Sequence, residues 1–579
     1  MLPFLASAGL LAGGLRHPWA GTAACALVWG LAWRTDRLAQ RRLVAGKGAG
    51  LWASFLVWLG LSVLASDQPW KGVYPLSVWL AVSAFFFMAR GLWEEPERLL
   101  WLWTLCGASL VLMAGSVLIQ RVSYPWTGFM PPYYNYNAFV MVAVIGAGIG
   151  ALGSGLSGRQ RWGLMVVMAL AVLWLLAARS RGGLFAAAAA AAIWLYRKER
   201  TRILFVGVLA AVTIAALIPQ AGWERPLKLD MAYAFRRPQI WAAAVKMATE
   251  HPLLGAGLGN FEQGFVRHAF PARLATNYGF FSDRAHSEPL HLLAETGWVG
   301  LALFLAGLAV FLRGAASPAA SSPRPLRDAG LGAFTAMSAH LLVDNMLHLP
   351  ALALLYFSAL AVASGRDALP EGDARPAAQE RPSLWRPACA AGLALALTAW
   401  IPARLGEILK ARTWSDPDSG RRIAAARAAV SLAPANDHLR SVLARAYMRA
   451  SPPRPEAALR EFKAASTLNP FNALHHAMAA EVHLRSGRPG PALAPLGEAV
   501  RLEPNFHNAR LLLAEVLYRM GRTAPAREEL SRLDERVESA KAFELHGGYD
   551  EIVVSLDERR RAALAEALTV RSPRGTPRR

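Results

Sequence analysis

Long apolar runs alternate with short polar connections over residues 1–402, and the pattern changes after that point. Runs of about 20 apolar residues are typical of transmembrane helices, because the hydrocarbon core of a bilayer is about 30 Å thick. We therefore expect an all-α, polytopic membrane domain over residues 1–402, with about 12–13 spans. The candidate spans lie near residues 3–15, 18–33, 51–66, 72–89, 98–119, 137–152, 161–178, 182–196, 201–219, 297–313, 328–346, 350–364 and 386–402.

The charged residues of the connections predict an orientation. Lys and Arg are concentrated in alternate loops, and the short loops on the other side hold only Arg16, Lys71, Arg121, Arg179 and Arg181. Because cytoplasmic loops carry the excess of Lys and Arg, the first set is predicted to be cytoplasmic. The long polar loop at about 220–296 and everything after residue 402 then face outward.

A second repeat pattern begins after the last span. Pro434, Pro470 and Pro504 lie 36 and 34 residues apart, each between two amphipathic helical stretches. This is the tetratricopeptide (TPR) period, and about three such repeats must stack to bury a continuous core. We predict an α-solenoid domain over 403–545, followed by a C-terminal helix and a disordered basic tail over 546–579.

The composition agrees with a membrane protein. Of 579 residues, 54% are hydrophobic and 18% are charged, which excludes a single soluble globular domain. The net charge of +22 does not indicate nucleic-acid binding, because the basic residues form short clusters between apolar runs. Cys25, Cys106 and Cys389 lie in apolar segments without CxxC or Cys/His spacing, so we expect no disulfide framework or zinc site. We also expect no cofactor and no other metal.

Two arginines lie at a predicted helix start in the long outward loop. Arg236 and Arg237 precede Pro238, a residue favoured in the first helical turn. The exposed amides and positive end of a helix, together with two guanidinium groups, form a candidate phosphate site. The alternative is a solvated basic helix start.

The turn at residues 179–183 has the same character. Arg179 and Arg181 lie beside Gly182 and Gly183 at an outward turn, against the positive-inside bias. A cation at that depth is a functional candidate unless it extends to lipid phosphate, which is the alternative.

The end of the outward loop contains His286, which is suited to act as a base or as a cation. A structural histidine is the alternative. The chain has no GxSxG motif and no metal-spaced histidines, so a hydrolase or zinc enzyme has little support.

The GAGLGNF stretch at residues 255–261 resembles a dinucleotide fingerprint only in part. Asn260 occupies the third glycine position, and no strand precedes the motif. We interpret Gly255, Gly257 and Gly259 as a tight turn that brings backbone to the membrane surface.

Two polar pairs lie near the outer ends of spans. Asn135 and Asn137 lie among tyrosines, where they suit either sugar binding or an aromatic belt. His340 and Asp344 are one helical turn apart and are predicted to pair with each other or with an arginine of another helix.

These motifs, taken in order, resemble the bacterial O-antigen ligase and polymerase superfamily over about residues 1–365. They are SRGG at 180–183, R-x-x-x-W from Arg237, HPLLGAGLGNF at 251–261, and HSEPLHLLAETGWVG from His286. Ser287, Gly297 and Gly300 satisfy the ligase signature that begins at the histidine. The asparagine pair is also similar to the family's asparagines at a helix start.

The resemblance implies a metal-independent, inverting glycosyltransferase of the GT-C type in the bacterial inner membrane. It would transfer a glycan from undecaprenyl diphosphate to a hydroxyl of a lipid, glycan or protein, at the periplasmic face where the loop and repeats lie. Arg237 and Arg181 would stabilise the diphosphate, and His286 would act as general base or as a diphosphate ligand. The further binding residues implied are Arg236, Arg179, Asn135, Asn137, Gly255, Gly257, Gly259, Ser287, Glu295 and Asp344.

The repeats separate this chain from ligases that end after their last helices. They favour a polymerase or a protein-directed enzyme over a lipid A core ligase, and they provide a surface for a partner protein. Two other classes are a lipid-linked glycan flippase and a membrane scaffold for the repeats. The first predicts inverted repeats, which the sequence does not show, and the second needs far fewer spans.

Overall fold

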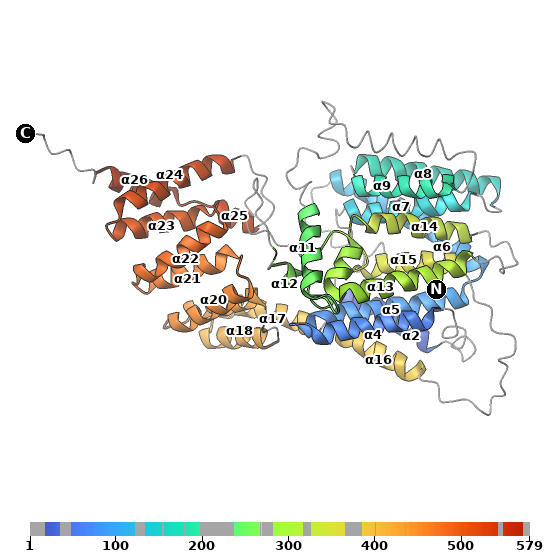
Figure 1. Cartoon of the computed structure of the whole chain (residues 1–579), viewed down its shortest axis with the longest axis horizontal. Coiled ribbons are helices and arrows are strands. Elements are labelled where there is room, and N and C mark those ends of the chain that lie inside the picture. Colours follow the sequence, from blue (N-terminus) through green and yellow to red (C-terminus); the bar gives the residue numbers. More distant parts are fainter. Residues whose placement is uncertain are drawn as a thin grey trace, which may run out of the picture. The chain divides into compact units, whose positions relative to one another are not determined.

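The computed structural model describes residues 18–34, 48–121, 134–152, 156–178, 180–196, 237–266, 268, 282–316, 326–364, 385–399, 401–432, 434, 436–541 and 548–570. Every regular element in these ranges is a helix, which confirms the all-α prediction (Figure 1). The chain divides into two compact units, Met1–Phe261 with Arg284–Ile401, and Glu262–Asp283 with Pro402–Arg579.

A helix occupies every predicted span that falls in the described residues; the runs 3–15 and 201–219 lie outside them. The helices of the first unit are α2 (Pro18–Trp33), α4 (Ala49–Ala65), α5 (Pro69–Leu92), α6 (Glu95–Arg121), α7 (Tyr134–Ala151), α8 (Gly158–Ala177), α9 (Arg181–Tyr196), α11 (Arg237–Glu250), α13 (Glu288–Ala316), α14 (Arg327–Leu341), α15 (Pro350–Ser364) and α16 (Trp385–Thr398). The division of the chain into units falls within the short α12 (Phe261–Val266), after its first residue.

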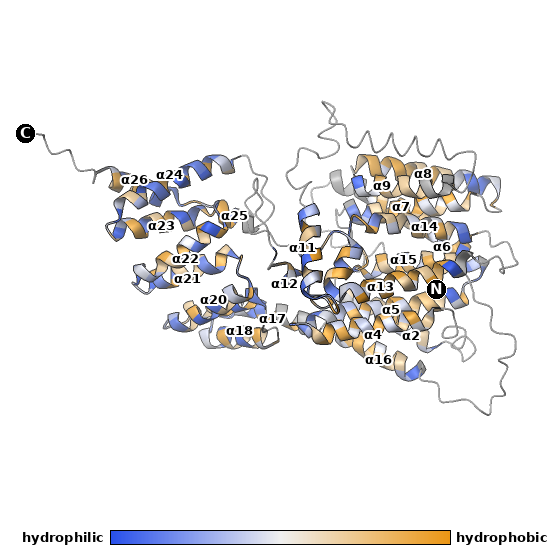
Figure 2. Ribbon diagram, in the orientation of Figure 1, coloured by the Kyte–Doolittle hydropathy of each residue, from blue (hydrophilic) through white to orange (hydrophobic). Residues whose placement is uncertain are grey.

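Apolar side chains on the outside of the first unit indicate a membrane protein. Within the described residues, four helices are long and apolar enough to cross a bilayer: α5, most of α6, α8 and most of α13. Five shorter apolar helices accompany them, so the total of 12–13 spans stays a prediction. The helices of this unit are mostly hydrophobic along their length (Figure 2). On α8, Trp162 is 70% exposed and Leu173 is 61% exposed, as expected for a helix that faces lipid.

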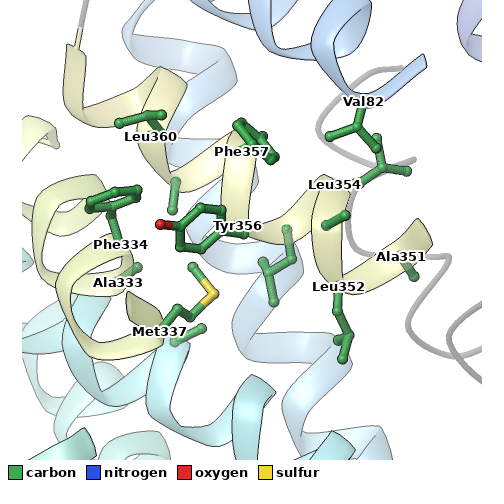
Figure 3. Close-up of a cluster of buried hydrophobic side chains, with 14 of the residues drawn as sticks. Val82, Ala333, Phe334, Met337, Ala351, Leu352, Leu354, Tyr356, Phe357 and Leu360 are labelled. Carbon is green, nitrogen blue, oxygen red and sulfur yellow. The ribbon is translucent and has the colours of Figure 1, made fainter. Parts of the chain in front are cut away.

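Glycines bring α7 and α14 into close contact. A Cβ on Gly146 would overlap the carbonyl oxygen of Gly332, and one on Gly150 would overlap the backbone at Asp328. Gly146 and Gly150 form a GxxxG pattern, which lets helix backbones approach closely in a membrane. On the other side of α14, its Phe334 packs against Tyr356 of α15 in the core (Figure 3). α14 is therefore fixed between α7 and α15.

The structure changes two boundaries that hydropathy predicted. The span expected at 328–346 ends as a helix at Leu341, and residues 342–349 form a turn before α15. The outward loop predicted at 220–296 contains α11 and α12, and its last residues already belong to α13. Gly297, with φ 72° and ψ −177°, interrupts α13 close to the Leu253 carbonyl, so the helix has two parts.

In the second unit, the helices from α18 to α24 pack in sequential order, as expected for the predicted solenoid, and α25 and α26 pack on α23 and α24. They are α17 (Ile401–Ser415), α18 (Ser419–Leu432), α19 (Asp437–Met448), α20 (Pro455–Leu468), α21 (Ala473–Arg485), α22 (Pro489–Leu502), α23 (His507–Arg519), α24 (Thr523–Ala540), α25 (Gly548–Val554) and α26 (Glu558–Val570). Asn436 and Asn472 cap α19 and α21 by accepting hydrogen bonds from backbone N–H groups. The predicted disordered tail after residue 570 lies outside the described residues.

Candidate functional site

Arg237 is the first residue of α11, where the sequence predicted a helix start. Its Nη2 lies 3.6 Å from Oδ2 of Asp344, and its Nη1 donates a hydrogen bond to the Val343 carbonyl. The Arg237 side chain is 34% exposed, whereas that of Asp344 is 7% exposed. The guanidinium group is thus fixed on the turn after α14 and still has an accessible side.

His286 lies on the other side of the same carboxylate. Its Nδ1 is 3.5 Å from Oδ1 of Asp344, and 36% of its side chain is exposed. Its backbone has φ 50°, and its carbonyl accepts a hydrogen bond from Nε1 of Trp241, one helical turn after Arg237. A positive φ in a residue other than glycine costs free energy, and such residues cluster at functional sites. Asp344 therefore joins Arg237 and His286.

Asp344 is held as an anion. Its Oδ1 accepts a hydrogen bond of 2.9 Å from the Asn345 backbone N–H. Burial acts to raise the pKa of Asp344, but the His286 hydrogen bond and the Arg237 charge outweigh burial and hold this pKa below its ordinary value. An ionised Asp344 favours an imidazole whose proton is on Nδ1, which leaves Nε2 as the acceptor.

Two buried side chains connect the start of α13 to the turn after α14. The Glu288 carboxylate accepts hydrogen bonds from the backbone N–H groups of Met346 and Leu347, at 3.1 and 3.2 Å. The Asn345 side-chain oxygen accepts one from the Ser287 N–H at 2.9 Å. These contacts fix His286 relative to Asp344. The sequence did not predict Asn345 or the role of Glu288. The only sign of either residue was a polar side chain next to a predicted site residue, and Asn345 also follows an apolar run.

The arginine-containing turn before α9 approaches the same place. A Cβ on Gly182 would lie 3.2 Å from Cγ2 of Val343 and 3.5 Å from Nε2 of His340. Arg181 is exposed, and the Arg237 charge acts on it electrostatically. The structure therefore brings Arg181, Arg237, His286 and Asp344 together from distant parts of the sequence. Arg179 and Arg236 lie outside the described residues.

Other predicted binding residues have packing contacts instead. Gly255, Gly257 and Gly259 have positive φ, as expected for a tight turn, and their backbone approaches Glu295, Ser66 and Lys71 respectively. The approach of this turn to the membrane surface stays a prediction. The buried Glu295 carboxylate accepts a hydrogen bond from the Phe261 N–H at 3.1 Å.

The remaining predicted residues lie beside the site or apart from it. Ser287 is buried next to His286, and its contact to the site is through its backbone. Asn135 and Asn137 lie at the start of α7, where Asn137 is 7% exposed. Within the described ranges, neither asparagine shares a hydrogen bond with Arg237 or His286.

Comparison with known proteins agrees with this arrangement. Residues 164–305 match the O-antigen ligase family model. This ligase segment includes Arg181, Arg237 and His286, and a tetratricopeptide repeat model matches residues 483–545. The predicted resemblance, a ligase segment followed by repeats, is confirmed. The match indicates O-antigen ligase-type activity.

Two solved structures are similar to the chain. A thermophilic TPR protein from Thermus thermophilus shares 24% identity, with 32% of this chain and 92% of that chain covered and a TM-score of 0.22. The Cut9–Hcn1 hetero-tetramer of the APC/C shares 12% identity, with 77% and 87% covered and a TM-score of 0.20. No curated protein matches the chain.

Proposed function

We propose that the chain transfers a glycan from undecaprenyl diphosphate to an acceptor hydroxyl at the periplasmic face of the inner membrane. The observation that supports this most is Asp344, which holds Arg237 and His286 on its two carboxylate oxygens while both side chains keep an exposed part. A cation and a base on one rigid support suit a reaction in which an anion leaves and a hydroxyl attacks.

Each side chain has one task in this mechanism. The acceptor hydroxyl gives its proton to Nε2 of His286 as its oxygen attacks the anomeric carbon. The bond from that carbon to the diphosphate oxygen breaks, and both of its electrons leave with the carrier. Arg237 and the nearby Arg181 stabilise the negative charge that develops on the diphosphate. Attack opposite the leaving group inverts the anomeric centre.

The experiment follows carrier release by the purified chain. Wild type is mixed with a lipid-linked glycan pool and with lipid A core, membrane protein and free lipid-linked glycan as acceptors. We expect wild type to release undecaprenyl diphosphate, and Arg237→Gln and His286→Gln to release at least about 100-fold less. Arg159→Gln on the exposed start of α8 is the matched control and keeps wild-type activity.

The labelled product then identifies the acceptor and separates a ligase, a polymerase and a protein-directed enzyme. The proposal is overturned if folded wild type releases no carrier with any acceptor but moves the lipid-linked glycan across a liposome bilayer. In that case the arginines belong to a transport path.

A further inference from the structure

We propose that α17 (Ile401–Ser415) lies in the membrane interface and docks the beginning of the repeat unit on anionic phospholipid headgroups. Only residues 399 and 400 separate α17 from α16 (Trp385–Thr398), which is one of the apolar helices. A helix that follows a span so closely starts near the bilayer surface. The inference rests on the membrane location of α16 and not on the proposed glycan transfer.

One side of α17 carries large apolar side chains that stay partly exposed in the unit to which α17 belongs. Leu405 is 40% exposed and Ile408 is 44% exposed, and Arg412 continues the same side one turn later. Thr413, which lies beside this side of the helix, is buried. Exposed aliphatic residues combined with cations on one helix are typical of helices that lie in the plane of a membrane interface.

The end of α17 holds two cations in place. The Trp414 ring lies 4.8 Å from the Arg445 guanidinium and 4.7 Å from that of Arg449, measured to the ring centroid. Arg445 lies in the last turn of α19, and Arg449 follows the last residue of that helix. Among the residues that the structure describes, neither forms an ion pair with a carboxylate. Because both guanidinium groups lie against the same ring, their like charges are close and repel each other. Burial and then the Arg449 charge lower the pKa of Arg445.

A phosphate group would relieve this repulsion. Guanidinium groups bind phosphate oxygens through two parallel hydrogen bonds, and stacking on an aromatic ring orients them in advance. Tryptophan is also enriched at the level of lipid headgroups. An acidic protein segment would satisfy Arg445 and Arg449 but would leave Leu405 and Ile408 in water. Anionic phospholipid provides both the phosphate for the arginines and the acyl region for the aliphatic side chains.

The first experiment measures the depth of α17 in the full chain, reconstituted in nanodiscs. All three native cysteines are buried, so a spin label attached to Ile408→Cys reports this position alone. The control label is at Ile552→Cys on α25, which is 49% exposed. We expect the label at 408 to collide with oxygen more often than with an aqueous nickel chelate, and the label at 552 to show the opposite preference. The proposal would be overturned if both labels collided more often with the nickel chelate than with oxygen.

The second experiment tests the lipid charge. Discs of phosphatidylcholine alone are compared with discs that also contain phosphatidylglycerol. We expect the oxygen-to-nickel collision ratio at position 408 to rise severalfold with phosphatidylglycerol, and this rise to disappear in Arg445→Gln/Arg449→Gln. Arg485→Gln, an exposed arginine paired with Glu481, is the control and keeps the rise.

Two outcomes contradict the headgroup assignment. One is a collision ratio that does not respond to phosphatidylglycerol. The other is protection of position 408 that appears only with two or more chains per disc, because a second copy of the chain would then cover α17. Amide hydrogen exchange across α19–α24 verifies that the double variant retains its fold.

Discussion

Asp344 is the residue on which the geometry of the candidate site depends. It contacts Arg237 and His286 from a turn that Glu288 and Asn345 hold in place. The motifs around Arg237 and His286 are local, so the sequence predicted both, and Asp344 was predicted because a carboxylate in an apolar run is costly without a partner. Glu288 and Asn345 were missed because their partners are 57 to 59 residues away in the chain.

Asp344→Asn preserves the shape of this site and removes its charge. The amide leaves Arg237 without its anion, and it no longer favours the imidazole form whose Nε2 accepts a proton. We expect kcat to fall by about 10²–10⁴-fold, with KM for the donor changed much less. Carrier release over a range of donor concentrations measures both constants. Unchanged kcat in a folded variant would remove Asp344 from the mechanism.

A part-buried hydrogen bond between a carboxylate and a histidine in the repeats predicts a pH effect on stability. Nε2 of His475 lies 2.8 Å from Oδ2 of Asp437, and Nδ1 is 2.7 Å from the Ser441 hydroxyl. Burial acts to raise the pKa of Asp437, but the His475 hydrogen bond and charge lower it below its ordinary value. The unfolded carboxyl binds protons more readily, so this stabilisation is complete above about pH 4 and is lost as pH falls through the lower, folded pKa.

Acid unfolding of the repeats measures this contribution. We expect the protection factors of the α19 and α21 amides, which take the slower intrinsic exchange in acid into account, to fall below about pH 4 in wild type. Asp437→Asn should exchange faster already at neutral pH and depend less on pH in that range. An identical acid profile for both proteins would show that Asp437 does not contribute.

At the scale of elements, hydropathy predicted where helices occur better than where they end. α14 stops at Leu341, but Leu342, Val343, Met346 and Leu347 continue the apolar run, so no local signal marks the turn that carries Asp344. α13 has the opposite problem, because its polar first turn looks like loop in the sequence. Both boundaries depend on hydrogen bonds between the two segments, which a single sequence does not reveal.

The close contact of α7 with α14 predicts how an element positions the site. In Gly146→Ala the new methyl group would meet the backbone of Gly332 and force α14, with the turn after it, away from α7. We expect a loss of about 1–3 kcal/mol in stability and a loss of activity, because Asp344 moves with α14. Gly163→Ala on α8, where nothing lies within 4 Å, is the control and should be neutral or slightly stabilising. Thermal unfolding and carrier release are measured for both variants. If Gly146→Ala were as stable and as active as Gly163→Ala, the packing role of Gly146 would be contradicted.

At the scale of the whole molecule, the proline period predicted the repeats because each repeat is a local unit with a fixed length. The apolar runs predicted the membrane part for a different reason, which is that lipid imposes the length of a helix. The sequence therefore contained two independent signals, and the structure divides the chain into two units with separate hydrophobic cores. Neither periodicity predicts that Arg181, Arg237, His286 and Asp344 come together at one site.

Separate cores predict that the two units lose stability separately. Phe462 is 1% exposed in the core of the first repeats, and Phe462→Ala should cost about 3–5 kcal/mol there. We expect hydrogen exchange to accelerate in α18–α21 and to stay unchanged in α7, α13 and α14. Carrier release with a small hydroxyl acceptor should also stay at the wild-type rate, because the four site residues belong to the other unit. Joint loss of protection in both units would show instead that they unfold as one cooperative body. A variant in the repeats would then lower activity by destabilising the whole chain.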